Sequence, residues 1–412
     1  MADFNIDTVR GQFPGLQVQD HGCERVYLDN PAGTQVPQTV IDAMSNVLAT
    51  KNANLGGHFA TAKAADSVVH DAHVAMADFY NASSPDEIVF GQNMTSLTLH
   101  FSRCLGRGLK AGDEIILSRM DHDANVAPWL LLAEDKGLVV KWLDFDTGTY
   151  EFADEAITKV LSDKTRILAM GMASNCTGTI HDVATFTKQA KSAGALVYLD
   201  AVQLAPHLAL DVQALGADAV VSSAYKWFGP HQGILWARKD LLAETFAYKV
   251  RAVPDADLGH KFETGTQSHE GMAGCAAAVD YLAGLGVGAT RRAKLISAWQ
   301  AVAAYEHGLT VQLIEGLKRF AGLTIRGIAS ANAVTRRVPT ISFTVEGVVP
   351  DTIAKALAAQ NIFVWSGHNY ALEPIARMGL ADKGGVLRVG LAHYNTPAEV
   401  DVLLGALQKV LI

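Results

Sequence analysis

The stretch VVSSAYKWFGPHQGIL, residues 220–235, places one lysine at the end of an apolar, β-branched run. The run before Lys226 predicts a β-strand, and Gly229-Pro230 after it predicts a turn. The amine would therefore lie at the rim of a buried sheet, away from bulk water. The other polar residues at the same edge of the sheet indicate which chemistry this amine takes part in.

Short apolar runs alternate with helical stretches from about residue 68 to residue 285. The predicted strands cover residues 87–90, 113–118, 165–171, 195–200, 217–222 and 233–237, and a helix is expected from Thr95. Near-continuous apolar strands separated by helices are typical of a mostly parallel sheet that is covered on both faces. The first fold prediction is therefore an α/β domain.

The pattern changes after the glycine-rich stretch AGLGVGAT, residues 283–290. A long helix is predicted at 291–319, a second at 351–360 and a last one from Thr396, with strands at 323–328, 340–345 and 362–365. This mixture predicts a smaller α+β domain. We divide the chain into an N-terminal segment, 1–25, expected to pack on the small domain, a large domain, 26–285, and a C-terminal small domain, 286–412.

Composition limits the class of protein. The 412 residues are 49% hydrophobic and 18% charged, which fits a well-packed globular chain. The net charge of −8 gives no electrostatic reason to bind nucleic acid or an anionic membrane. Four scattered cysteines form neither a zinc motif nor a disulfide framework, so no metal is expected. With no apolar leader or spanning stretch, the expected location is cytoplasmic.

Four polar residues follow four different predicted strands. Asp200 ends one strand, and His122, Asn175 and Lys226 each follow another by four residues. Taken singly, they are a helix cap, a solvated loop histidine, a turn residue and a surface charge. Ligands bind beyond the carboxyl ends of strands in open α/β sheets, and four coincidences at one edge are improbable. We therefore expect one binding site.

Pyridoxal 5'-phosphate (PLP) chemistry needs this set of side chains. A lysine amine forms a Schiff base with the PLP aldehyde, and an aspartate faces the pyridine nitrogen. A flat side chain stacks on the ring, and a helix N-terminus with hydroxyl groups holds the phosphate. The turn in GQNMTSLTLH, residues 91–100, supplies Thr95, and Ser223 lies three residues before the lysine.

Ordered motifs along nearly the whole chain then suggest a family. They are YLDNPAGTQVP (27–37), MDHDANVAPW (120–129), ASNCTGTIHDV (173–183), VYLDAVQLAPH (197–207), SSAYKWFGP (222–230), FETGTQSHEG (262–271) and LRVGLAHYNT (387–396). With them the chain resembles class V aminotransferase-fold PLP enzymes, in particular the cysteine desulfurase-like branch. The resemblance implies the type I fold of PLP-dependent transferases, with a mixed, mostly parallel sheet in the large domain and a smaller α+β C-terminal domain.

The resemblance also implies roles for individual residues. The implied cofactor contacts are Lys226, Asp200, Gln203, Asn175, His122, Thr95, Met94, Ser223, Tyr225 and Thr266. Thr266 is expected to reach the phosphate of a neighbouring subunit, which implies a homodimer with shared active sites. The implied substrate contacts are Arg388, which grips the carboxylate, together with Asn30, His58 and Tyr370. Further polar candidates for the pocket are Glu263, His269, Glu270, Arg251 and His368.

The departures from the family pattern bear on the reaction. Tyr370 stands where desulfurases carry the loop cysteine that takes up the substrate sulfur. A phenol has a pKa of about 10, and its oxygen cannot form a persulfide. Cys176, beside Asn175, is expected to be a packed small residue rather than a nucleophile. Tyr225 replaces the usual histidine before the lysine, and Met94 replaces a phosphate-site threonine.

The sequence thus predicts an enzyme in which Lys226 removes the Cα proton of an amino acid to give a carbanion. We expect β-elimination, such as C–S bond cleavage, rather than persulfide formation. Transamination and epimerisation stay open, because the fold does not choose between them. A non-catalytic sulfur-relay or accessory scaffold is the alternative of another class. The sequence leaves the substrate and the fate of the carbanion undecided.

Overall fold

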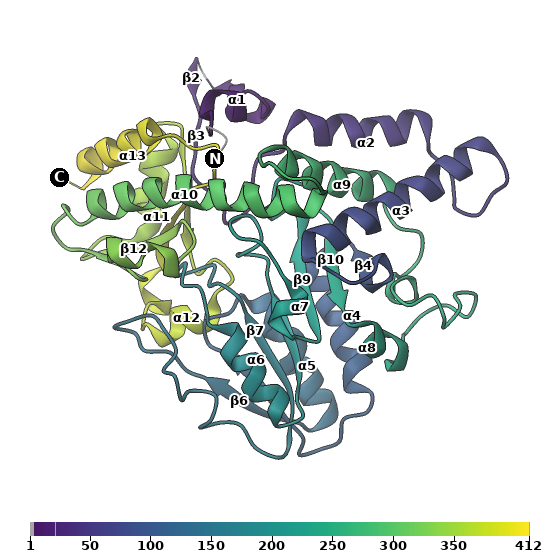
Figure 1. Ribbon diagram of the computed structural model, residues 1–412. Coiled ribbons are helices and arrows are strands. Elements are labelled where there is room, and N and C mark those ends of the chain that lie inside the picture. Colours follow the sequence, from purple (N-terminus) through teal and green to yellow (C-terminus); the bar gives the residue numbers. More distant parts are fainter. Residues whose placement is uncertain (1–3, 21, 412) are drawn as a thin grey trace.

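The computed structural model describes residues 4–20 and 22–411 (Figure 1). Its α-helices are α1 (Ile6–Arg10), α2 (Gln38–Thr50), α3 (Ala60–Tyr80), α4 (Met94–Gly106), α5 (Ala127–Lys136), α6 (Val183–Ser192), α7 (Val212–Leu215), α8 (Lys239–Glu244), α9 (His269–Gly284), α10 (Arg291–Leu317), α11 (Pro350–Ala358), α12 (Leu372–Arg377) and α13 (Pro397–Val410). No helix in this described part is long and apolar enough to cross a membrane.

The strands form one large sheet, one smaller sheet and two short pairs. They are β1 (Gln19–Asp20), β2 (Cys23–Glu24), β3 (Val26–Tyr27), β4 (Ile88–Gly91), β5 (Glu114–Ser118), β6 (Val139–Leu143), β7 (Thr165–Gly171), β8 (Leu196–Asp200), β9 (Ala219–Ser223), β10 (Gly233–Ala237), β11 (Leu323–Ile325), β12 (Thr340–Val345), β13 (Ile362–Phe363), β14 (Trp365–Gly367) and β15 (Val386–Gly390).

The large sheet has the order β4-β10-β9-β8-β7-β5-β6. β10 runs antiparallel to β4 and β9, and the other neighbours pair in parallel. The mixed, mostly parallel sheet is therefore confirmed. β6 was missed from the sequence, although its run VVKWL pairs along all five residues with β5.

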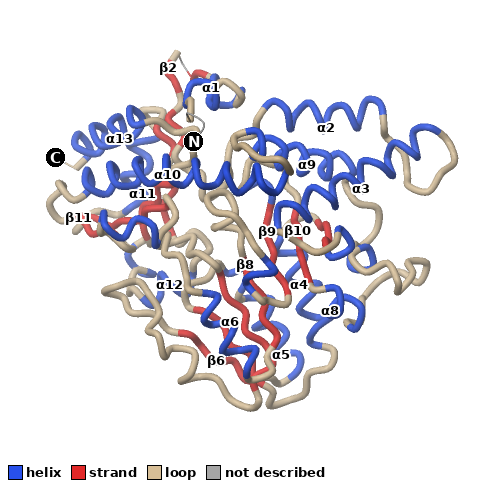
Figure 2. The backbone as a smooth tube through the Cα atoms, viewed as in Figure 1, coloured by secondary structure: helices blue, strands red, loops and turns tan. Residues whose placement is uncertain are grey.

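Helices lie on both faces of this sheet (Figures 1 and 2). Two apolar layers pack between these helices and the sheet. One contains buried side chains from α3, α6 and α9, including Phe79, Phe186 and Met272. The other contains side chains from α4 and α5, including Phe101 and Trp129. Burial on both faces explains why β7, β8, β9 and β10 are mostly apolar in sequence, with their polar residues at the strand ends.

The smaller sheet has the order β11-β12-β15-β14, and α10, α11 and α13 supply its apolar layer. The strand predicted at 362–365 is in fact two short strands. β13 pairs in parallel with β3 near the N-terminus, whereas β14 pairs with β15. The long helix predicted at 291–319 is α10, which contacts α13 at one end and α9 and α3 at the other (Figure 1).

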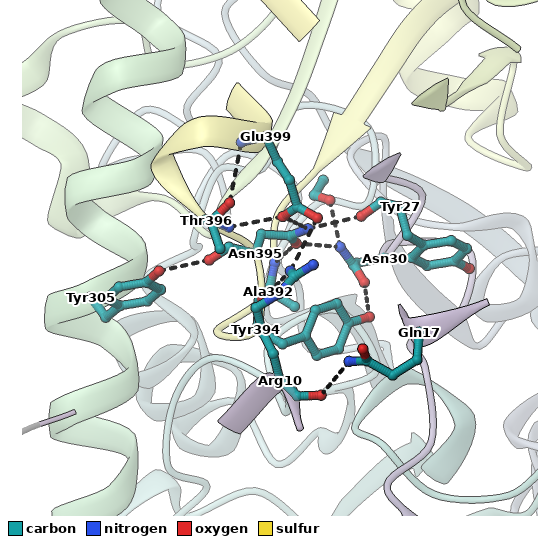
Figure 3. Close-up of polar contacts among 11 residues, drawn as sticks. Arg10, Gln17, Tyr27, Asn30, Tyr305, Ala392, Tyr394, Asn395, Thr396 and Glu399 are labelled. Carbon is teal, nitrogen blue, oxygen red and sulfur yellow. Dashed lines mark hydrogen bonds and ion pairs between the residues drawn. The ribbon is translucent and has the colours of Figure 1, made fainter. Parts of the chain in front are cut away.

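A polar network joins the N-terminal stretch to the last helix (Figure 3). Arg10 pairs with Glu399 at 3.0 Å, and Glu399 also accepts from the side chain of Asn395. Asn395 in turn donates to the backbone carbonyl of Tyr27, and Asn30 donates to the side-chain oxygen of Asn395 at 3.0 Å. Within the first 25 residues, Arg10 makes this contact with the last helix, while Val9, Phe13 and Leu16 pack in the apolar layer of the large sheet. The packing of the N-terminal segment on the small domain and the domain boundaries remain our proposal.

Candidate active site

A cavity of about 490 Å³ lies at the carboxyl ends of the large sheet. Residues that follow β4, β5, β7, β8 and β9 line it. Among them are Met94, Thr95, His122, Asn175, Asp200, Gln203, Ser223, Tyr225 and Lys226, so most of the predicted cofactor residues meet in one place. The structure leaves their individual roles as predictions, but it places them together.

Lys226 ends a short 3-10 helix, Ala224–Lys226, that directly follows β9. Its amine donates to the backbone carbonyl of Pro31, and the backbone amide of Thr34 donates to the carbonyl of Tyr225 at 3.0 Å. The turn that contains Pro31 and Thr34 therefore holds both the lysine side chain and the backbone just before it. Burial, with a smaller contribution from the nearby Arg388 charge, lowers the pKa of Lys226 to about 7. A lysine of this kind is unprotonated often enough near neutral pH to act as a nucleophile or base.

Asp200 is the last residue of β8 and is buried. Its Oδ1 accepts from the backbone amide of Val202 at 2.8 Å. Burial raises the pKa of Asp200 to about 6, while that hydrogen bond and the charge of Lys226 act in the opposite direction. Asp200 is thus a buried carboxylate, without a salt-bridge partner in the described chain, that suits a cationic ring nitrogen.

Asp121 is a second buried carboxylate in the cavity wall, and sequence reasoning missed it. Its oxygens accept from the backbone amide of Gly171 at 2.9 Å and from the side chain of Asn125 at 2.8 Å. Burial raises the pKa of Asp121 to about 7. Asp121 links the end of β7 to the turn that carries His122, so it fixes the position of that histidine.

The ring of His122 faces the cavity from the turn after β5. Its Nδ1 accepts from the backbone amide of Ala124 at 3.0 Å. Burial lowers the pKa of His122 to about 3, with added repulsion from Lys226 and Arg388. The imidazole is therefore neutral at physiological pH, and its flat face is available for stacking.

The N-terminus of α4 forms another wall of the cavity. Asn93 caps this helix, and its side chain accepts from the backbone amide of Ser96 in a capping box. The backbone amide of Met94 donates to the hydroxyl of Ser223 at 3.0 Å, which joins the helix to the end of β9. Gly233 allows this close approach, because a Cβ there would lie 2.3 Å from the backbone of Asn93. A helix N-terminus lined by Thr95 and Ser223 suits a phosphate.

A second cavity of about 530 Å³ adjoins the first and shares Lys226, His122 and Asn175 with it. Arg388, from β15, and Tyr370 line this second cavity. The Nη2 atom of Arg388 lies 3.5 Å from Asp29, while its Nε is buried without a hydrogen-bond partner. The guanidinium of Arg388, in the same cavity wall as Lys226, is well suited to a carboxylate ligand.

Three predicted site residues lie outside both cavities. Asn30 is buried in the network of Figure 3, where it donates to the carbonyl of Gly390 and accepts from Tyr394. His58 lines neither cavity. Thr266 lines two other hollows, and one of these also contains Gln92 and His231 from the cofactor cavity wall. The predicted contact of Thr266 with a second subunit stays a prediction.

Glu263, one of the further polar candidates for the pocket, contacts two histidines and lines neither of the two cavities that contain Lys226. Its carboxylate contacts His73 at 3.1 Å and His260 at 2.8 Å, and it accepts from the backbone amide of Phe90. Burial acts to raise the pKa of Glu263, but the hydrogen bonds from the two histidines outweigh it and lower this pKa to about 2. Glu263 thereby ties α3 and β4 to the loop that leads to Thr266.

Other wall residues that the sequence reading passed over are Gln92 and His231. Gln92 belongs to the turn that was singled out for Thr95, so its position in that turn was an available signal. His231 follows the glycine-proline turn after the lysine and stacks on Tyr225, with ring centroids 4.9 Å apart. No sequence pattern distinguishes such a contact from that of a surface histidine.

The sequence pattern of the family described as aminotransferase class-V matches residues 26–403. The chain belongs to the class V aminotransferase family. A probable cysteine desulfurase of Streptomyces coelicolor is 33% identical over 98% of this chain and 97% of its own length. The aminotransferase-like protein FGM3 of Gibberella zeae is also 33% identical, over 100% of this chain and 99% of its own.

Comparison with solved structures agrees with this family. The apo structure of a cysteine desulfurase from Thermococcus onnurineus NA1 has a TM-score of 0.86 and 26% identity, and the match covers 100% of this chain and 99% of that one. The chain is therefore a PLP-dependent enzyme of the cysteine desulfurase-like branch, with the type I fold.

The residues present fit PLP. Lys226 for the aldehyde, Asp200 for the ring nitrogen and the α4 N-terminus for the phosphate line one cavity. Asn175 has a buried Oδ1 without a partner, and its Nδ2 donates one hydrogen to the carbonyl of Asn369 at 2.8 Å. Its second amide hydrogen remains for a ligand oxygen. Gln203, which donates to Thr340 at 2.8 Å, lies in the same wall.

Proposed function

We propose that this enzyme eliminates a leaving group from Cβ of an amino acid and does not form a protein persulfide. One observation carries the proposal: the loop beside Lys226 and Arg388 presents Tyr370, and none of the four cysteines lines either cavity of the described chain. Cys104, Cys176 and Cys275 are buried, and Cys23 lies on β2. A sulfur acceptor is thus missing where a desulfurase needs one.

The thiol of Cys176, the residue after Asn175, is also unreactive. Cys176 is fully buried, and burial raises its pKa to about 12. The thiolate is the nucleophilic form of cysteine, so a thiol with this pKa does not attack sulfur at neutral pH. Cys176 therefore does not replace the missing loop cysteine, which supports elimination.

Different residues of this chain bind the substrate, accept its proton and contact the cofactor. Arg388 holds the substrate carboxylate with its guanidinium, which orients the amino acid toward Lys226. The amine of Lys226, with its lowered pKa, accepts the Cα proton. With PLP bound, the carboxylate of Asp200 would favour a protonated ring nitrogen, and the neutral imidazole of His122 would offer its flat face to the ring. PLP, when bound, supplies the electron sink for the resulting carbanion.

Transamination is the second candidate, because a relative that matches the whole chain is named an aminotransferase-like protein. It would use the same binding contacts and the same proton transfer to Lys226. A sulfur-relay scaffold has less support, because Lys226 and Asp200 are both present in one cavity. The homodimer and the cytoplasmic location also belong to this proposal.

The test is a product assay on purified protein loaded with PLP. The protein is mixed with a panel of amino acids, bound PLP is followed by absorbance, and products are identified by mass spectrometry. Elimination predicts pyruvate with release of the leaving group and no persulfide on the protein. A keto acid that retains the substrate side chain would indicate transamination, and a D-amino acid would indicate epimerisation. Lys226→Ala is the negative control and should lose both the characteristic absorbance and the activity.

A further inference from the structure

The outer part of the second cavity is apolar. Its wall includes Leu99 from α4, Ala127, Pro128 and Leu131 from α5, Trp365 from β14 and the ring of Tyr370. Three of these large side chains are strongly exposed in the described chain: Leu131 at 45%, Trp365 at 57% and Tyr370 at 66%. Exposed apolar side chains gathered around one hollow are typical of a ligand-binding surface.

This apolar wall is continuous with the reaction site. Lys226, His122 and Asn175 line both cavities, and Arg388 lines the second. A ligand whose carboxylate is held by Arg388 and whose Cα lies near Lys226 would direct its side chain along this wall. The volume of about 530 Å³ lies in the range of roughly 300–1,000 Å³ that is common for sites of drug-sized ligands, and far exceeds the needs of a thiol.

The charges of the cavity point to the same kind of ligand. Two basic side chains line this cavity. Lys226 lies in the part of the wall that both cavities share, and Arg388 lies where we expect the substrate carboxylate to bind. Asp123 is the carboxylate of this wall, and burial raises its pKa. The wall residues in α5 and β14 provide no charged partner for a polar substituent.

We propose that this cavity binds a large apolar group on the leaving atom, so that the substrate class is S-alkyl- or S-aryl-substituted L-cysteine. The inference rests on the proposed elimination and specifies its substrate. The Cα–H bond breaks with its proton passing to Lys226, and the Cβ–S bond breaks with its electron pair staying on sulfur. The thiolate takes a proton, and the released 2-aminoacrylate reacts with water to give pyruvate and ammonia.

Binding separates this inference from the elimination itself. PLP-loaded protein is titrated with L-2-amino-5-phenylpentanoate, which has a methylene in place of the sulfur of S-benzyl-L-cysteine, and with L-alanine. Neither ligand has a leaving group. Burial of a phenyl group should make the first ligand bind about 10- to 100-fold more tightly, as measured by calorimetry. In parallel, kcat/KM for pyruvate formation should be higher for S-benzyl-L-cysteine than for L-cysteine.

Two neighbouring leucines of α5 provide a matched pair of variants. Leu131→Asp places a charge in the cavity wall and should remove most of the preference for the phenyl ligand, with less effect on L-alanine. Leu130→Asp is the control, because Leu130 is 38% exposed but does not line the cavity. Since both positions are exposed, both variants should fold, which circular dichroism checks. Trp365→Ala gives a second test of the wall.

The outcomes are distinct. Equal affinity for the phenyl ligand and L-alanine, or equal behaviour of the Leu131→Asp and Leu130→Asp proteins, would overturn the apolar subsite even if pyruvate is formed. Tight, Leu131-dependent binding of the phenyl ligand without pyruvate from any S-substituted cysteine would overturn the elimination instead. Tight binding, pyruvate formation and selective loss in Leu131→Asp together are the expected result.

Discussion

The imidazole of His122 is stacked on the phenol of Tyr370, with ring centroids 5.5 Å apart and an angle of 24° between the planes. A backbone hydrogen bond fixes the pair, because the amide of Asp123 donates to the carbonyl of Tyr370 at 2.7 Å. His122 belongs to the large sheet and Tyr370 to a loop beside the small one. The stack therefore joins the proposed cofactor-facing ring to the wall of the substrate cavity.

Replacing Tyr370 tests what its ring contributes. Tyr370→Phe keeps the stack, so kcat/KM for pyruvate formation from S-benzyl-L-cysteine should stay within about threefold of the parent. Tyr370→Ala removes an aromatic pair of about 0.5–1.5 kcal/mol and should lower kcat/KM by about two- to tenfold. If the Phe protein falls as far as the Ala protein, the hydroxyl rather than the ring is what matters.

Arg388→Lys should weaken substrate binding although the charge is kept. A lysine cannot reproduce the planar, two-pronged contact of a guanidinium with a carboxylate. We expect KM to rise by about 10- to 100-fold, with a smaller effect on kcat. Steady-state kinetics on an α-amino acid measures this, and the corresponding amine without a carboxylate is the control ligand. A variant that lowers kcat and leaves KM unchanged would contradict carboxylate binding by Arg388.

Lys226 makes the stability of the PLP-free protein depend on pH. Its pKa is lowered to about 7 in the folded chain and is near 10.5 when unfolded, so between these values the unfolded chain binds more protons. The contribution of Lys226 to stability therefore increases as pH rises from about 7 to 10.5. Lys226→Met, which cannot titrate, should raise Tm relative to the parent by more at pH 7 than at pH 10. Thermal unfolding at both pH values checks this, and an equal difference would argue against a depressed lysine pKa.

Cys176→Ala should retain catalysis. The thiol packs with Ala371, Ile375, Leu380 and Val386, so its loss should cost about 1 kcal/mol of stability and leave pyruvate formation unchanged. Cys23→Ala, at an exposed position, is the matched control and should affect neither quantity. A fall in kcat of tenfold or more in Cys176→Ala alone would reopen a covalent sulfur mechanism.

The strands that the sequence located best are those buried on both faces. The prediction at 165–171 agrees with β7, the one at 233–237 with β10 and the one at 340–345 with β12. Their β-branched, apolar runs have sharp polar or glycine boundaries, so local chemistry alone marks where they end. The strand that carries Arg388, β15, was not predicted, because VLRVG is short and contains a charge; the resemblance indicated only the arginine itself.

Other features depend on contacts between distant segments. Residues 362–365 belong to two different strands, β13 and β14. Their partner strands, β3 and β15, lie more than twenty residues away in the sequence, so no local pattern shows the division. The apolar wall near Tyr370 combines α4, α5 and β14, and no local pattern brings these together. Asn30 belongs to a motif that predicted substrate contact, yet its amide is engaged with Gly390 and Asn395. Sequence spacing therefore indicated the sheet edge but not the shape of the substrate cavity.

The loop tip at Tyr370 is held by main-chain groups. The carbonyl of Asn369 accepts from Asn175, and that of Tyr370 accepts from Asp123. Both tip residues have a positive φ, 53° and 55°, a conformation that side chains other than glycine adopt uncommonly and that most disfavours valine, isoleucine or threonine. Because these anchors are main-chain carbonyls, they do not depend on the side chain at position 370. Evolution, or a protein engineer, could therefore change the side chain that this loop presents to the cavity by a single codon change and keep the anchoring of the loop.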